Sequence, residues 1–169
     1  MSITIRKFRK DDLPVMREIW NEVVEEGNAF PQDMPLQEED CRQFFSSQSY
    51  CAVAENEKKE ICGLYILHPN NVGRCGHISN ASYAVSKKCR GGHIGRQLVT
   101  DCLHQAGELG FRILQFNAVV ASNLPARHLY EQLGFISLGT VKGGFRNKSG
   151  EYEDICLYYY NLTADRSGT

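Results

Sequence analysis

The stretch Arg90-Gly91-Gly92-His93-Ile94-Gly95-Arg96 decides the fold. It follows Ala81–Val85, a run typical of a strand, and precedes an amphipathic segment that ends at Gly110. Apolar residues recur along that segment at helical spacing: Ile94, Leu98, Val99, Cys102, Leu103, Ala106 and Leu109. A strand, a glycine-rich turn and a helix in this order present unpaired N–H groups and a positive dipole end to an anion. The sequence therefore predicts a phosphate-binding loop, with a plain glycine turn as the alternative.

Charge supports the anion-binding interpretation. Arg90 and Arg96 place guanidinium groups at both ends of the stretch, and guanidinium matches paired phosphate oxygens well. The stretch is not a P-loop, because no Gly-Lys-Ser/Thr closes it. It is not the Gly-x-Gly-x-x-Gly fingerprint either, because His93 and Ile94 break that spacing.

A second segment, Asn123-Leu-Pro-Ala-Arg-His-Leu-Tyr130-Glu-Gln-Leu-Gly134-Phe135, has the signals of a short helix. It begins with a capping residue and a first-turn proline, and it ends at glycine. With both segments in this order, the chain resembles the GNAT superfamily of N-acetyltransferases. That family pairs an Arg/Gln-x-x-Gly-x-Gly/Ala loop with a later Asn…Ala…Leu-Tyr-Glu-x-Leu-Gly-Phe helix. The resemblance runs from the first strand to near the C-terminus, and one departure is His93, which replaces the first glycine.

Periodicity and turn residues predict the other elements. Expected strands cover residues 3–8, 50–54, 61–67, 77–85, 112–120, 135–141 and 153–160. Expected helices follow Asp11 or Asp12 up to Gly27, cover 37–45, follow the glycine loop, and cover 124–133. We expect one α/β domain of the α+β type over residues 1–162, with a polar tail at 163–169. Its mixed, mostly antiparallel sheet has six or seven strands and helices on both faces. The resemblance implies that the strands beside the glycine loop splay into a cofactor wedge.

Composition narrows the partners. A chain of 169 residues with a net charge of −1 has no general attraction to nucleic acid or to an anionic membrane, and no apolar run approaches a membrane span. Seven cysteines, odd in number and never spaced as Cys-x-x-Cys, favour a reduced cytoplasmic protein without a metal site. A homodimer is compatible with the resemblance, and the sequence leaves it open.

The resemblance implies acetyl-CoA as the cosubstrate. Tyr83, Ala84 and Val85 would hold its pantetheine arm through strand backbone, and Gly91 to Arg96 would hold its pyrophosphate. Backbone N–H groups do this work, so His93 either points away from the phosphates or adds a donor. Asn123 would bond to the arm near the sulfur, and a helix cap alone is the other interpretation.

Tyr130 matches the position of the family's general acid. A phenol with an ordinary pKa of about 10 matches a departing alkylthiolate, so proton transfer would cost little. The alternative is core packing, because Tyr130 shares a helix face with Ala126 and Leu133.

The general base is less defined. Asn80 stands where relatives that acetylate small amino acids often carry glutamate. Asparagine takes no proton, but it orients a substrate or stabilises an oxyanion. His77 is a candidate base because its ordinary pKa lies near neutrality, and a simply exposed histidine is the alternative. Glu25 and Glu26 would reach the pocket through water, or are solvated.

The acceptor side is expected in three places. The loop Ala29–Pro35, with Phe30, lies in the family's acceptor region. Asn80, Asn117 and Asn123 resemble the branch that acetylates proline analogues. Gly143–Asn147 resembles a loop of phosphinothricin-type enzymes, with Phe145 as a pocket wall and Arg146 as a carboxylate ligand, or it is a flexible hairpin end.

These features predict transfer of acetyl from acetyl-CoA to the amine of a small molecule, an amino acid or an analogue. Two alternatives stay open: acetylation of a protein's lysine or N-terminus, and an acyl-CoA sensor without turnover.

Overall fold

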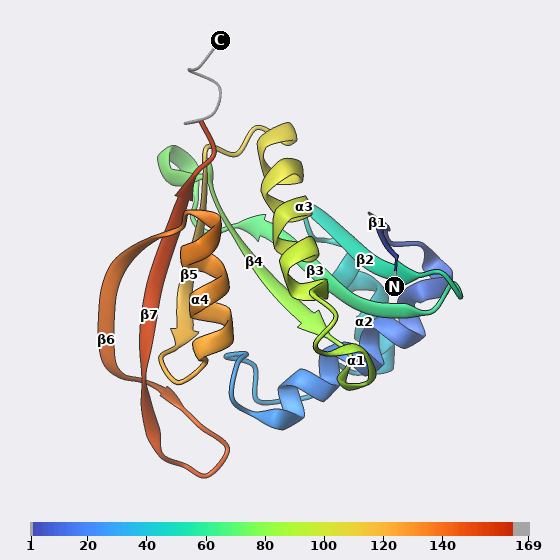
Figure 1. Ribbon diagram of the computed structural model, residues 1–169, viewed down its shortest axis with the longest axis horizontal. Coiled ribbons are helices and arrows are strands. Elements are labelled where there is room, and N and C mark those ends of the chain that lie inside the picture. The colour runs from blue at the N-terminus through green and yellow to red at the C-terminus, as the bar shows by residue number, and fades with distance from the viewer. Residues whose placement is uncertain (1, 164–169) are drawn as a thin grey trace.

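The computed structural model describes residues 2–163 and contains one seven-stranded sheet in the order β1-β2-β3-β4-β5-β7-β6 (Figure 1). The strands are β1 (Ile3–Lys7), β2 (Tyr50–Asn56), β3 (Ile61–Pro69), β4 (Ile78–Val85), β5 (Ile113–Val120), β6 (Ile136–Arg146) and β7 (Tyr152–Asn161). The α-helices are α1 (Leu13–Glu26), α2 (Glu38–Ser46), α3 (Ile94–Glu108) and α4 (Leu124–Leu133). Short 3-10 turns are η1 (Lys10–Asp12), η2 (Gly73–Cys75) and η3 (Lys87–Cys89). The predicted mixed sheet is confirmed, whereas most of the expected tail lies outside the described residues.

Two apolar cores cover the two faces of the sheet. Along β2 and β3 successive side chains alternate between faces, so Val53 packs under α1 and α2 with Trp20, while Tyr65 packs under α3 with Leu98. Trp20 is almost fully buried, with its ring 4.4 Å from the ring of Phe30. Helices therefore lie on both faces, as the sequence predicts. None of the helices within residues 2–163 has the length and apolar character to cross a bilayer.

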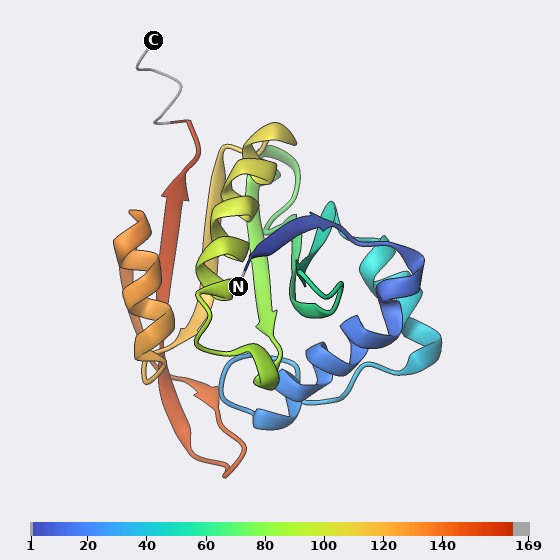
Figure 2. The same cartoon turned by 45° about the vertical axis from the view of Figure 1, so that its right-hand side comes forward.

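The sheet opens between β4 and β5. These parallel strands pair only at Ile78 with Ile113 and at Ser79 with Leu114. Beyond that point they diverge, as Figures 1 and 2 show, and β5 continues its pairing with β7 alone. A register shift between Phe116 and Val119 bends β5 away, as bulges do. The splay that the family resemblance implies is therefore present, and it leaves the facing backbone edge of β4 unpaired.

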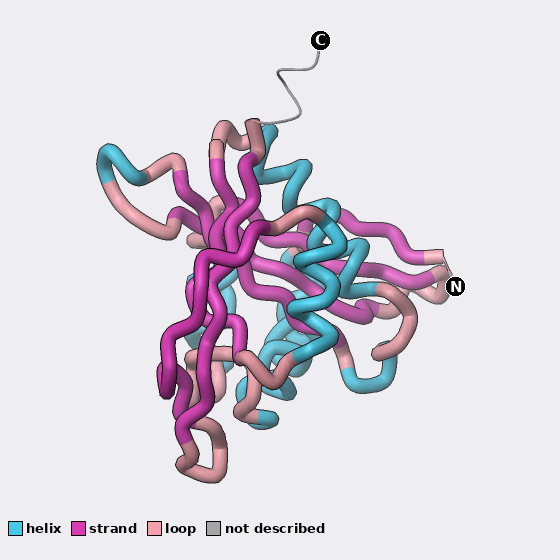
Figure 3. Tube along the Cα trace, turned by 60° about the vertical axis from the view of Figure 1, so that its left-hand side comes forward, coloured by secondary structure: helices cyan, strands magenta, loops and turns pink. Residues whose placement is uncertain are grey.

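The β6–β7 hairpin corrects one expectation. The sequence predicts that the sixth strand ends at Val141 and that a loop follows from Gly143, but β6 continues to Arg146. Phe145 pairs with Glu153 after a register shift that starts at Val141. The turn that follows β6 is closed by Asn147, whose Oδ1 accepts the N–H groups of residues 149 and 151. The hairpin thus projects as a long two-stranded arm (Figure 3).

Candidate functional site

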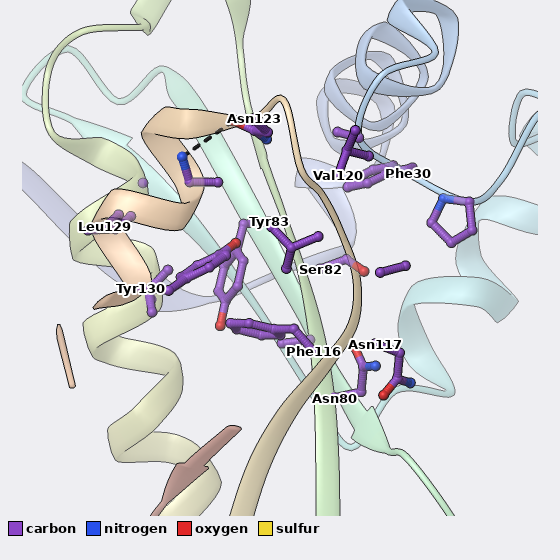
Figure 4. A pocket seen from close by; sticks show the side chains of 18 of the residues that line it. Phe30, Asn80, Ser82, Tyr83, Phe116, Asn117, Val120, Asn123, Leu129 and Tyr130 are labelled. Carbon is purple, nitrogen blue, oxygen red and sulfur yellow. Dashed lines mark hydrogen bonds between the residues drawn. The ribbon is translucent and has the colours of Figure 1, made fainter. Parts of the chain in front are cut away.

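A cavity of about 410 Å³ lies in the gap between β4 and β5. Its walls come from both faces of the sheet. On the α3 and α4 side they include Tyr83 and Tyr130, and on the α1 side Phe30 and Asn80, as Figure 4 shows. The other lining residues are Ala29, Pro31, Ala81, Ser82, Gly95, Val99, Phe116, Asn117, Ala118, Val119, Val120, Asn123, Pro125, Ala126 and Leu129. The opened strand pair therefore gives one cavity lining residues from both faces of the sheet.

A second cavity, of about 600 Å³, adjoins the first at the glycine loop. The two share lining residues: Ala29, Tyr83, Gly95, Asn123 and Pro125. The second cavity is also lined by Arg90, Gly91, His93 and Ile94 from the loop and by Glu26 from α1. A continuous path thus leads from the start of α3 into the opened strand pair.

The glycine loop leads directly into α3. Gly91 has φ 90° and His93, the N-cap of α3, has φ 59°, so both take the left-handed conformation. Such a φ is unfavourable for a residue with a side chain, which explains glycine at 91 and makes His93 a strained exception. The His93 side chain is exposed and makes no capping bond. A Cβ on Gly95 would meet only Leu129, at 4.0 Å, so the fold itself does not require glycine there.

Arg90 is engaged with α1. Its guanidinium donates to both carboxylate oxygens of Glu26, at 2.6 and 3.2 Å. Glu26 is therefore paired with Arg90 rather than simply solvated, and it lines the second cavity. Arg96 reaches Gln132 on α4 at 3.5 Å.

Asn123 caps α4, which is one of the two roles that its sequence context allows. Its Oδ1 accepts the backbone N–H of Ala126 at 3.3 Å, which caps α4. The same residue lines both cavities.

Tyr130 extends from α4 toward β4 inside the cavity (Figure 4). Its ring lies 4.6 Å from the ring of Phe116 and 5.5 Å from that of Phe135. Burial raises the pKa of Tyr130 above the usual tyrosine range, and the nearby Cys102 and Tyr158 raise it further. The phenol is therefore neutral near pH 7, able to donate a proton and unable to act as a base. The expectation of an ordinary pKa near 10 is wrong, because neighbouring elements enclose the ring.

Amide side chains occupy the end of the cavity where β4 and β5 are still close. Asn80 donates from Nδ2 to Oδ1 of Asn70 at 3.2 Å, and Asn117 donates to the same oxygen at 2.5 Å. Gln115 donates to Oδ1 of Asn117 at 3.2 Å. Sequence reasoning singled out Asn80 and Asn117 but missed Asn70 and Gln115. Asn70 has no distinguishing signal, because asparagine is an ordinary residue in the turn after β3.

Three of the expected residues lie elsewhere. His77 precedes β4, is exposed, and is not among the residues that line the cavity, so the structure does not bring it to Tyr130 or Asn80. Phe145 and Arg146 line another cavity, of about 950 Å³, beside the β6–β7 hairpin. That cavity shares Phe30 and Pro31 with the first one and also includes Glu25. In the described part of the chain, no cluster of His, Cys, Asp and Glu is arranged to hold a metal ion.

Comparison with known proteins agrees with this geometry. Residues 13–135 match the family model described as the acetyltransferase (GNAT) family. N-acetyltransferase aca1 of Schizosaccharomyces pombe is 30% identical, over 92% of this chain and 83% of its own length. The Bacillus subtilis protein YwnH is 27% identical, over 83% of this chain and 88% of its own length. Its name gives phosphinothricin acetyltransferase as a provisional activity. The structure of a GCN5-related N-acetyltransferase from Kribbella flavida superposes with a TM-score of 0.87 at 30% identity, covering 94% of this chain and 97% of that one.

Proposed function

The chain belongs to the acetyltransferase (GNAT) family and is an acetyl-CoA-dependent N-acetyltransferase, and from this premise we propose that its acceptor is a small amine, an amino acid or an analogue. The observation that carries the proposal is the cavity in the strand gap. Its acceptor side is confined by Phe30 and Pro31 and carries the amides of Asn80 and Asn117. The cavity of about 410 Å³ also has to admit the end of the pantetheine arm, so the space that remains suits a small acceptor better than an extended peptide. The resemblance to YwnH supports the same class of acceptor.

The free edge of β4 fits the cosubstrate. Tyr83, Ala84 and Val85 pair in register with β3, and because successive residues of an antiparallel pair direct their N–H and C=O groups to alternate edges, part of this backbone faces the gap left by β5. Unpaired strand backbone is a partner for the amides of a pantetheine arm, as in strand addition. Gly91 to Arg96 would then meet the pyrophosphate at the start of α3, and Asn123 would lie beside the arm where the two cavities join.

Acetyl-CoA supplies an activated thioester whose C–S bond breaks as the amine nitrogen bonds to the acetyl carbon. Asn80 offers the approaching amine a carbonyl oxygen, which accepts one of its N–H groups. Tyr130 then donates its proton to the departing thiolate, the proton that the attacking nitrogen loses passes to water, and water returns a proton to the tyrosinate. Burial raises the pKa of this phenol, but a thiolate in the same enclosed cavity is also desolvated and is a stronger base than in water. The pKa values of the phenol and of the leaving thiol are therefore raised together, and the proton transfer stays favourable.

The test is CoA release with two panels measured side by side. One contains amino acids, cyclic imino acids and amino-acid analogues, and the other contains peptides with a free N-terminus or a lysine. Turnover confined to the first panel is the expected result. Faster turnover of peptides would assign a protein acceptor instead, and CoA binding without any turnover would favour a sensor.

A further inference from the structure

Asn70 lies outside the cavity but bridges the two strands that open to form it. Its side-chain oxygen accepts Nδ2 of Asn80 from β4 at 3.2 Å and Nδ2 of Asn117 from β5 at 2.5 Å. The last paired residue of β4 is Ser79, one position before Asn80. The Oδ1 atom of Asn70 therefore links β4 and β5 just beyond the last backbone pair of their ladder, Ser79 with Leu114.

Asn70 is itself held in place. Its backbone N–H donates to the carbonyl of Ile78 at 2.7 Å, which anchors the turn to the start of β4. Its own Nδ2 reaches Oδ1 of Asn117 at 3.4 Å. The side chain is half-buried, so its carboxamide has defined neighbours.

These bonds determine which end of each amide is available. A carboxamide has one accepting oxygen and one donating nitrogen. Asn117 uses both ends inside the network, because its Oδ1 accepts from Gln115 and Asn70. Asn80 uses only its nitrogen, so among the described residues its Oδ1 has no donor. An amine is a donor and needs that oxygen.

We propose that Asn70 is a positioning residue, which turns the carboxamide of Asn80 so that its oxygen faces the acceptor amine. The inference rests on the proposed function, because it takes Asn80 as the group that meets the acceptor. Asn70 acts through Asn80 and touches neither substrate.

The first experiment is steady-state kinetics of Asn70→Ala, Asn70→Asp and Asn71→Ala with an accepted small amine. Asn70→Ala removes the shared acceptor, so the acceptor KM should rise about three- to tenfold, the effect of one hydrogen bond, while the acetyl-CoA KM stays unchanged. Asn70→Asp keeps an accepting oxygen for Asn80 and loses only the 3.4 Å bond from Nδ2 to Asn117, so it should return the acceptor KM to within about twofold of wild type. Asn71→Ala is the matched control in the same turn, since the side chain of Asn71 accepts only the N–H of Val72, at 2.7 Å, among residues 2–163.

A purely structural role for Asn70 predicts another pattern. Asn70→Ala and Asn71→Ala would then lower thermal stability alike and leave the acceptor KM equal, which would overturn the proposal. Failure of Asn70→Asp to restore the acceptor KM would also overturn it.

A second experiment needs no acceptor. The side-chain NH₂ resonances of Asn80 in ¹⁵N–¹H spectra should shift in Asn70→Ala and keep their wild-type positions in Asn70→Asp and Asn71→Ala. Equal small shifts in all three variants would refute the bridging role. If wild type acetylates nothing on either panel, the proposed function fails, and these spectra still decide the role of Asn70.

Discussion

Tyr130 is the residue on which the chemistry can be tested with least damage to packing. Its ring packs among Phe116, Phe135 and Tyr158, and these contacts involve the ring and not the hydroxyl. Tyr130→Phe keeps the ring and deletes the proton donor. We expect kcat to fall about 10²- to 10⁴-fold, the usual contribution of general acid catalysis, with little change in Tm or CoA affinity. Stopped-flow measurement of CoA release gives kcat directly, and an unimpaired rate where chemistry is limiting would remove Tyr130 from the mechanism.

The raised pKa of Tyr130 predicts a particular pH profile. Because burial keeps the phenol protonated above the usual tyrosine range, its ionisation should not reduce kcat between about pH 8 and pH 10. A tyrosine with an ordinary pKa would lose activity over the upper part of that interval. The measurement is kcat against pH for wild type, with Tyr130→Phe as the reference for any other titrating group. A limb centred near pH 10 in wild type alone would show that the hydroxyl is better solvated than its packing implies.

At the scale of elements, the glycine loop separates the needs of the fold from those of the ligand. Gly91 takes φ 90°, so a side chain there strains the backbone. Gly95 lies in the first turn of α3, where a Cβ meets nothing closer than 4.0 Å. Gly95→Ala should therefore raise the unfolding free energy by up to about 1 kcal/mol, because alanine is the better helix former. The same methyl should weaken CoA binding about tenfold or more, if the pyrophosphate approaches this backbone.

Calorimetric titration with CoA and thermal unfolding would measure the two effects on one variant. Gly91→Ala is the contrasting change, since it should lower stability through backbone strain. Unchanged CoA affinity in a stabilised Gly95→Ala protein would place the pyrophosphate elsewhere.

Elements bounded by strong local signals could be predicted from sequence. The expected helix 124–133 agrees with α4, because Asn123, Pro125 and Gly134 act within a few residues of one another. The start of the sixth strand could also be predicted, but its continuation to Arg146 could not, because Gly143-Gly144 is typical of a turn whereas the reason for glycine at 144 is tertiary. A Cβ on Gly144 would lie 2.6 Å from Cγ1 of Ile155 on β7, so glycine here permits close packing of two strands.

Site residues in local motifs could likewise be predicted from sequence, whereas features that depend on tertiary contacts could not. The glycine loop, Asn123 and Tyr130 belong to local motifs, and the structure places all of them along connected cavities. The bridge from Asn70 to Asn80 and Asn117 joins three separate segments, so no local pattern reveals it. The raised pKa of Tyr130 likewise arises from burial that elements distant in sequence provide.

At the scale of the whole molecule, one ionic cluster ties the N-terminal strand to the rest. Arg6 on β1 donates to both oxygens of Asp12, at 2.8 and 3.0 Å, and to Glu55 on β2 at 2.8 Å. Asp12 is almost fully buried and precedes α1, so the cluster joins β1, β2 and the first helix. The bonds from Arg6 hold the pKa of Asp12 below its usual range.

This lowered pKa predicts acid sensitivity. Above about pH 4, the ordinary aspartate value, folded and unfolded chains are both deprotonated at Asp12 and the full stabilisation is present. As pH falls toward the lower folded pKa, the unfolded chain takes up the proton first, so stability is lost.

Arg6→Met should lower Tm near pH 7 by a few degrees, at about 2–4 °C for each kcal/mol, with solvent screening reducing the ionic part. It should also flatten the fall in Tm below pH 4, because the carboxylate has lost the partner that depressed its pKa. Lys7→Met, an exposed neighbour on the same strand, controls for the loss of a positive charge. Thermal unfolding of both variants from pH 3 to pH 7 decides the matter, and parallel curves for Arg6→Met and wild type would show that Asp12 does not carry the acid dependence.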